Sequence, residues 1–154
     1  CCGQNVDVAN RFLAMPSYRN RILGWQLYKF KIAGFLHWGF NFWNSQNSRS
    51  RIDPYTVTDA GRAFPGGDPF SVYPGPDGPI KSLRMKVFHH ALQDMRALEL
   101  LESLRGPEAV KALPGFGGMT FSTYPRSPGS LLAWRETVNG EIAKHMAEKE
   151  QADG

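Results

Sequence analysis

The sequence predicts an α/β fold with parallel strands, and three observations along its first part lead to this prediction. A periodic apolar pattern over residues 18–32 indicates a helix with a broad buried face. An aromatic stretch without a helical stripe follows at residues 35–43 and indicates a strand. Cys1 and Cys2 supply a plausible preceding strand. Since a helix between two strands is a βαβ unit, the strands are expected to run parallel.

The first helix is expected to follow Pro16 and Ser17 and to end at Gly34, where glycine breaks the helical pattern and opens the strand. Its apolar residues lie near one stripe, which neighbouring apolar positions widen. They are Tyr18, Ile22, Trp25 and Ile32, with Leu23, Leu27 and Phe30 beside them.

The aromatic strand reads Phe-Leu-His-Trp-Gly-Phe-Asn-Phe-Trp over residues 35–43, and alternation divides it into two faces. One face is wholly apolar and suits a layer of covering helices: Leu36, Trp38, Phe40 and Phe42. The other face also carries polar groups: Phe35, His37, Gly39, Asn41 and Trp43. This second face ends in an amide beside a flat indole ring.

A long polar connection and a second strand come next. Residues 44–67 are rich in loop-forming residue types, and loops of this length are usually functional or disordered. A short strand is expected over residues 70–73, closed by the turn formers of residues 74–79. The second helix is then expected to run from an N-cap at Ser82 to a stop at Gly106.

The last third of the chain is predicted to be helical. A short helix is expected over residues 107–113, followed by a glycine- and proline-rich connector at residues 115–129. Ser130 is expected to cap a final helix, because apolar residues recur after it at three- and four-residue steps. The polar tail at residues 148–154 is expected to fray.

Composition argues against several classes of protein. The net charge is +4, but Lys and Arg are scattered among Asp and Glu, so a mixed solvated surface is favoured over a nucleic-acid partner. No apolar run approaches the roughly 18 residues of a membrane span. The two cysteines are adjacent, which argues against a disulfide framework, and neither a metal site nor a cofactor is indicated.

Several motifs in one order together resemble a known family. They are Asn-Arg-Ile-Leu-Gly-Trp at residues 20–25, the aromatic strand at 34–43, Gly-Asp-Pro-Phe-Ser-Val-Tyr-Pro-Gly at 67–75, and Ser-Leu-Arg at 82–84 with Gln-Asp at 93–94. The sequence resembles the C-terminal half of the catalytic domain of glycoside hydrolase family 123 over most of residues 1–105. Motifs in a fixed order are much more specific than any one of them alone.

The resemblance implies the C-terminal portion of a (β/α)8 TIM-type barrel. Residues 1–2, 35–43 and 70–73 would lie in about its sixth, seventh and eighth strands. A complete barrel needs about 250 residues, so 154 residues cannot close one. We interpret the chain, which opens without Met, as the C-terminal part of a larger protein, with the N-terminal half of the barrel as its partner.

On this interpretation, residues 1–106 form the barrel part and residues 107–154 form a helical C-terminal extension. The sequence does not indicate a cellular compartment.

Four residues are predicted to bind substrate. Barrel enzymes place their active sites at the C-terminal ends of the strands, so Asn41, Trp43 and Tyr73 are expected at the mouth, and Trp38 is the fourth candidate. Sugars offer an apolar C–H face to an aromatic ring and a polar rim to an amide. The alternative is structural: the tryptophans fill the barrel and Asn41 caps a turn.

No catalytic residue is expected in this chain. Glycoside hydrolysis usually needs two carboxyl groups. The resemblance implies instead that the substrate's own acetamido group acts as nucleophile, oriented by an Asp next to an acid/base Glu. The sequence contains no Asp-Glu pair. The catalytic acid is therefore expected upstream, and the chain alone is expected to be inactive.

Three other polar residues are predicted to be structural. His37 is expected to be a hydrogen-bonded histidine, Asp68 a turn former, and Arg84 a member of a buried ion pair.

The leading hypothesis is a glycosidase fragment that acts on a β-linked sugar, an N-acetylhexosaminide being the named candidate. A non-catalytic carbohydrate-binding or degenerate barrel domain is the alternative. A third hypothesis is an interaction fragment without any sugar role.

Overall fold

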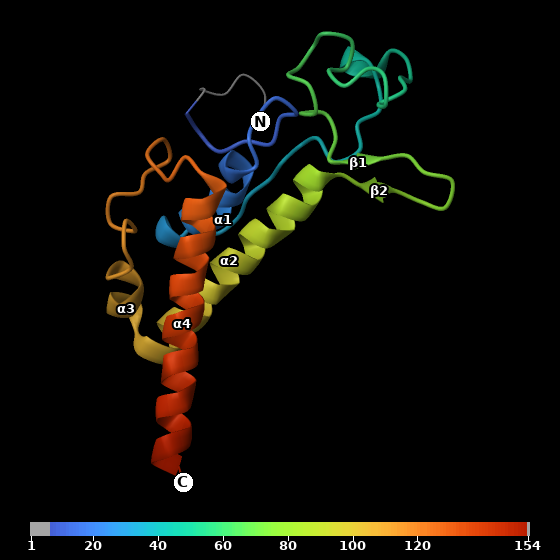
Figure 1. Cartoon of the computed structure of the whole chain (residues 1–154). Helices are drawn as coiled ribbons and strands as arrows, with labels where there is room; N and C mark the ends of the chain where they lie inside the picture. The colour runs from blue at the N-terminus through green and yellow to red at the C-terminus, as the bar shows by residue number, and fades with distance from the viewer. Residues whose placement is uncertain (1–6, 154) are drawn as a thin grey trace.

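In a computed structural model of the chain, residues 7–153 are described, and they form a mostly helical protein with one small hairpin (Figure 1). The elements are α1 (Tyr18–Lys29), the 3-10 turn η1 (Gln46–Ser48), β1 (Val72–Tyr73), β2 (Ile80–Lys81), α2 (Leu83–Arg105), α3 (Pro107–Lys111) and α4 (Pro128–Asp153). The helices gather in one part of the molecule. The loops between α1 and α2, with the hairpin, form the other (Figure 1).

The helical part closes around one hydrophobic core. Helix α1 packs against α2, and α4 packs against both. Trp25 of α1 lies 5.0 Å from Trp134 of α4, measured between ring centroids. Gly24 allows α1 to approach α2 closely, because a Cβ at this position would meet the backbone carbonyl of Ala91. The main buried members of the core are Ile22, Trp25, Leu98, Leu101, Val110, Met119, Leu131 and Val138.

A buried carboxylate joins three helices. The side chain of Asp94 on α2 is fully buried, and it accepts hydrogen bonds from Arg21 Nε at 2.7 Å and from Arg135 at 3.0 Å. The Trp25 indole N–H donates to the same carboxylate at 3.3 Å. Because α1 and α4 both supply cations, Asp94 fixes α4 against the rest of the helical part.

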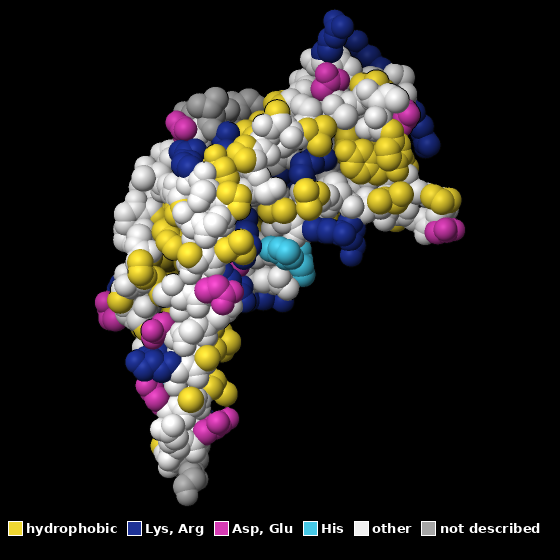
Figure 2. Space-filling model, in the orientation of Figure 1, with side chains coloured by type: hydrophobic (Ala, Val, Ile, Leu, Met, Phe, Trp, Pro, Cys, Tyr) yellow, Lys and Arg dark blue, Asp and Glu magenta, His cyan; other side chains and the backbone are white. Residues whose placement is uncertain are grey.

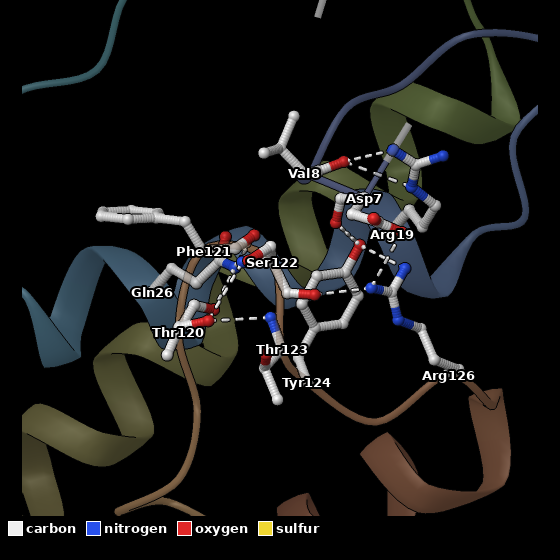
Figure 3. A network of polar contacts seen from close by, with 10 residues as sticks. All are labelled: Asp7, Val8, Arg19, Gln26, Thr120, Phe121, Ser122, Thr123, Tyr124 and Arg126. Carbon is white, nitrogen blue, oxygen red and sulfur yellow. Dashed lines mark hydrogen bonds and ion pairs between the residues drawn. The ribbon is translucent and has the colours of Figure 1, made fainter. Parts of the chain in front are cut away.

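The connector before α4 is also held in place by side chains of α1. The Gln26 amide donates to the carbonyls of Thr120 and Phe121 at 3.1 and 3.2 Å (Figure 3). Further along, the Tyr124 hydroxyl donates to the carbonyl of Asp7 at 2.8 Å (Figure 3). This stretch is rich in glycine and proline, and yet it is ordered by contacts with distant segments.

The helix limits predicted for α2 are confirmed. Ser82 is its N-cap, with the hydroxyl oxygen accepting a hydrogen bond from Met85 N at 3.1 Å. Gly106 ends α2 with φ +79°, a left-handed value that glycine adopts without strain.

The predicted limits of α4 and α1 were wrong. Helix α4 begins at Pro128 and continues through the polar tail to Asp153. The hydroxyl of Ser127, and not Ser130, accepts a hydrogen bond from the first turn, at 3.1 Å from Ser130 N. Proline suits the first helical position because it has no N–H to leave unpaired. Helix α1 ends at Lys29, and Lys31 takes a positive φ of 49°.

The predicted strand at residues 35–43 was wrong. This segment makes only one isolated antiparallel bridge, between Asn41 and Phe70. The sheet in the described residues is the β1–β2 hairpin, which is antiparallel with Val72 opposite Lys81, so no parallel topology and no barrel form within residues 7–153. A strand is stabilised by hydrogen bonds to neighbouring strands, and among residues 7–153 the aromatic segment forms only the Asn41–Phe70 bridge. The predicted strand at Cys1–Cys2 lies outside the described residues.

Candidate functional site

The long loop after the aromatic segment is folded by its own polar side chains. The Asp53 carboxylate accepts from Tyr55 N at 3.0 Å, and Asp59 accepts from Gly61 N and Arg62 N at 3.1 and 2.9 Å. Asn44 and Arg51 form an antiparallel bridge across the base of the loop. Turns of this kind give the loop a fixed path, so it can form one wall of a site.

Gly39 brings the aromatic segment against the second half of the loop. A Cβ at Gly39 would collide with the backbone of Asp68 and Pro69. The close approach allows Phe42 N to donate to the Pro69 carbonyl at 3.0 Å, next to the Asn41–Phe70 bridge. The glycine therefore sets the positions of the residues that follow it.

Asn41 and Trp43 meet at a surface cleft. The cleft has a volume of about 430 Å³ and is lined by Asn41, Trp43, Asn44, Arg51, Ile52, Pro54 and Pro74. Asn41 is exposed, whereas Trp43 is half-buried. Hydrophobic side chains also gather at the surface near β1 and the adjoining loops (Figure 2). The cleft thus offers a ring face, side-chain amides and one guanidinium group to a ligand.

The polar edge of the Trp43 indole is already occupied. Its N–H donates to the carbonyl of Val72 in β1 at 3.0 Å, which holds the ring in place. The indole N–H is therefore not free to donate a hydrogen bond to a ligand. Hydrogen bonding in the cleft is left to neighbouring side chains such as Asn41.

Tyr73 lies next to the cleft but does not line it. Its ring lies 5.0 Å from the Tyr55 ring and 5.1 Å from the Phe70 ring. Tyr55 in turn donates its hydroxyl hydrogen bond to Pro74, a residue of the cleft wall, at 2.9 Å. Tyr73 and Tyr55 together form an aromatic pair that supports the wall.

Trp38 is separate from the cleft. It packs on Phe42 and Phe64, with ring centroids 5.3 and 4.9 Å apart, and its indole N–H donates to Asp68 at 3.2 Å. The structure therefore brings Asn41 and Trp43 together, places Tyr73 beside them, and puts Trp38 elsewhere.

Two residues of this region were not predicted from the sequence. Arg51 lines the cleft, and Tyr55 is 57% exposed beside it. Both lie in the loop at residues 44–67, whose length marked it as functional or disordered. A charged and an aromatic residue inside such a loop were the available signal.

A buried polar cluster lies beside the aromatic segment. Arg84 donates to the carbonyls of Arg11, Gly67 and Phe70 at 3.1, 2.7 and 2.9 Å, so it binds backbone and forms no ion pair within residues 7–153. Asp68 is fully buried and accepts the Trp38 indole N–H through one carboxylate oxygen. Its other oxygen has no partner among the described residues. Burial raises the pKa of the Asp68 carboxyl.

His37 belongs to the same cluster and differs from its prediction. Both of its ring nitrogens are buried without a hydrogen-bond partner in the described part of the chain. Burial, helped by the charge of Arg11, lowers the pKa of His37 to about 4. His37 is therefore neutral at pH 7. The expected hydrogen bond is not formed with good geometry, although the backbone of Asp68 lies close enough to oppose the lowering of the pKa.

The lining of the cleft carries no acidic side chain. The cleft therefore contains no group able to protonate a leaving oxygen. Among residues 7–153, no three His, Cys, Asp or Glu side chains come together as metal ligands. The helices described are too short or too polar to cross a membrane.

Comparison with known proteins places these features in a family. The model of the family described as glycoside hydrolase 123, catalytic domain, matches residues 1–101. That range contains α1, the cleft, the hairpin and most of α2. A search of curated proteins returned no match. Because the matched range covers well over half of the chain, this protein belongs to the glycoside hydrolase 123 catalytic-domain family.

Proposed function

We propose that the Asn41–Trp43 cleft binds the sugar of a β-linked glycoside, with N-acetylhexosaminides as the substrate class. The observation that carries the proposal is the fixed Trp43 ring on an open cleft beside the exposed amide of Asn41. The indole N–H is occupied by Val72, which leaves the ring face for a sugar. Membership of a glycoside hydrolase family supports a carbohydrate as the ligand.

The two groups have complementary roles in this proposal. A pyranose ring stacks its C–H face on the indole, and its hydroxyl or acetamido groups exchange hydrogen bonds with the amide. Trp43 supplies most of the affinity because aromatic rings bury much apolar area. Asn41 supplies orientation, since an amide both donates and accepts. Tyr73 supports the wall of the cleft through Tyr55. Of the four predicted residues, Trp38 is the one least expected to contact the sugar.

We also propose that the chain binds without cleaving. Glycoside hydrolysis needs a proton donor at the leaving oxygen. The cleft lining has no carboxyl group, and Asp68 is fully buried, with Trp38 bonded to it. The acid of the intact enzyme is therefore expected on another part of the barrel, and the 154-residue chain is expected to release no aglycone.

The barrel itself remains part of the proposal. The segment ahead of Asn41 exposes apolar side chains, with Leu36 82% and Phe35 44% exposed. Exposed apolar side chains of this kind suit a strand that packs between neighbours. We propose that residues 1–106 complete a (β/α)8 barrel with further strands, and that residues 107–154 are an extension added to it.

Sugar binding by the chain tests the proposal. Methyl β-N-acetylglucosaminide and methyl β-N-acetylgalactosaminide are titrated by calorimetry into the chain and its variants. Trp43→Ala is expected to weaken binding about tenfold, since loss of a stacked ring costs about 1.5 kcal/mol. Asn41→Ala is expected to weaken it severalfold through loss of hydrogen bonds.

Phe121→Ala provides the matched control. Phe121 is also an exposed aromatic residue, at 48%, but it stacks on Phe30 at the helical part. Its replacement is expected to leave sugar affinity unchanged. If Trp43→Ala and Asn41→Ala left every sugar affinity unchanged, the sugar role would be rejected in favour of an interaction fragment.

The alternative is a barrel that binds carbohydrate without hydrolysing it. The lack of acidic residues in the cleft lining supports this alternative. Nitrophenyl glycosides distinguish the two once the chain is joined to further barrel strands. Release of nitrophenol by the longer protein supports the glycosidase. Sugar binding without release supports the non-catalytic domain.

A further inference from the structure

A second cavity, separate from the sugar cleft, lies between the aromatic segment and the start of α2. Its volume is about 170 Å³, and it shares no lining residue with the cleft. Its walls combine three polar side chains, Arg11, His37 and Ser71, with apolar ones that include Phe35 and Phe88. Phe35 is 44% exposed, so the cavity reaches the surface.

Arg11 is the principal polar group of this cavity. It is only 4% exposed, and its guanidinium carbon lies 5.2 Å from the Phe35 ring centre and 5.1 Å from that of Phe88. Its Nε has no hydrogen-bond partner in the described residues. A guanidinium packed between two rings keeps its edge free for hydrogen bonds in its own plane. The Nε–H of Arg11 is thus a buried donor without an acceptor among residues 7–153.

The charges around the cavity do not balance. Two guanidinium groups, the buried one of Arg11 and the half-buried one of Arg84, interact with one buried carboxyl group, Asp68. His37 adds a neutral ring with two unpartnered nitrogens. Buried charge without a partner is costly, so one negative charge placed here is favourable.

The size and walls of the cavity narrow the class of anion. A cavity of about 150 Å³ accommodates a ligand the size of benzene. A single excess positive charge matches a monoanion better than phosphate, whose second charge would remain unpaired. A carboxylate also matches the fork of a guanidinium group. From these observations we propose that this cavity binds a small carboxylic acid with a compact apolar body, held by Arg11 with help from His37 and Ser71.

Benzoate is a suitable probe, and benzamide is its neutral counterpart of equal shape. Each is titrated into the isotopically labelled chain, and the backbone amide signals of Ser71 and Phe88 are followed by NMR. Benzoate is expected to shift both signals with a dissociation constant on the order of 1 mM. Benzamide is expected to bind at least tenfold more weakly, because it carries no charge for Arg11.

Two variants and a control test whether Arg11 and the cavity bind the carboxylate. Arg11→Met is expected to weaken benzoate binding at least tenfold, whereas Arg96→Met, which removes an exposed arginine of α2, is expected to leave it unchanged. If Arg11→Met does not fold, Met85→Trp fills the cavity from α2 and is expected to abolish binding. Equal binding of benzoate and benzamide, unchanged binding in a folded variant, or no shift at the solubility limit of benzoate would each overturn the proposal.

Discussion

The helical part and the loop part of this protein are built in different ways. In the helical part, α1, α2 and α4 enclose an apolar core, and the buried charge of Asp94 has three hydrogen-bond partners. In the loop part, apolar side chains such as Leu36 are exposed, and buried polar atoms of His37 and Asp68 lack partners. The first arrangement provides stability, and the second leaves buried polar atoms without partners, so we propose that ligands bind in the loop part.

The largest expected effect is the loss of the buried carboxylate. Asp94→Ala removes the acceptor shared by Arg21, Arg135 and Trp25. The free energy of unfolding, measured with urea, is expected to fall by about 3–5 kcal/mol. Glu141→Ala removes a half-exposed carboxylate bonded to Arg105 and serves as control, with an expected loss below about 1 kcal/mol. Equal losses in the two variants would contradict the role given to Asp94.

A pair of leucines gives the next largest effect and tests the comparison directly. Leu98 is fully buried in the helical core, whereas Leu36 in the loop part is 82% exposed. Leu98→Ala is expected to cost about 2–5 kcal/mol of unfolding free energy. Leu36→Ala is expected to stay within about 0.5 kcal/mol of the parent chain. If Leu36→Ala cost as much as Leu98→Ala, the loop part would carry the fold as well.

The pH dependence of stability is expected to arise partly from the loop part. The pKa of His37 lies at about 4 in the folded chain, below its ordinary 6.5. As the pH falls, the unfolded chain therefore protonates His37 before the folded chain does. The free energy of unfolding falls as the pH drops from 6.5 towards 4. After allowance for partial exposure, the loss attributed to His37 is about 1–2 kcal/mol.

His37→Phe tests this dependence through the difference between two urea titrations, at neutral and at acidic pH. The variant is expected to lose less stability on acidification than the parent. His89→Phe, which changes an exposed histidine of α2, is expected to follow the parent. A parallel fall in His37→Phe and the parent would show that His37 does not bind its proton more weakly in the folded chain.

The smallest expected effect concerns the junction of the two parts. Ser82 caps α2 through its hydrogen bond with Met85 N, so Ser82→Ala is expected to cost about 1 kcal/mol. Ser103→Ala lies within the same helix and removes no cap, and it is expected to be nearly neutral. Thermal unfolding of both variants distinguishes the cap from a general effect of replacing serine. A neutral Ser82→Ala would contradict the capping role.

The same comparison explains what could be predicted from the sequence. Helices depend on local patterns, so the apolar stripe of α1 and the caps Ser82 and Gly106 indicated real elements. Residues 35–43 have the composition of a strand, but a strand requires partners that the local sequence does not contain. The pairing of Asn41 with Trp43 could be predicted because the two residues are neighbours in sequence.

The parts of the site that depend on distant residues could not be predicted. The buried cluster joins Arg11, His37, Asp68 and Arg84, which lie far apart in the sequence. Alternation did separate Trp38 from Asn41 and Trp43, and the structure places Trp38 on Phe42 and Phe64 away from the cleft. It could not reveal that Arg51 folds back from the loop to line that cleft.

The four tryptophans offer the most direct test that binding belongs to the loop part. Trp25 and Trp134 lie in the helical core. Trp38 donates its indole N–H to Asp68, and Trp43 lines the cleft. Their indole N–H signals are followed by NMR while methyl β-N-acetylglucosaminide or methyl β-N-acetylgalactosaminide is added. We predict that the Trp43 signal shifts in a saturable way while those of Trp25 and Trp134 stay fixed. A fixed Trp43 signal with both sugars, or equal shifts of the core tryptophans, would contradict this account.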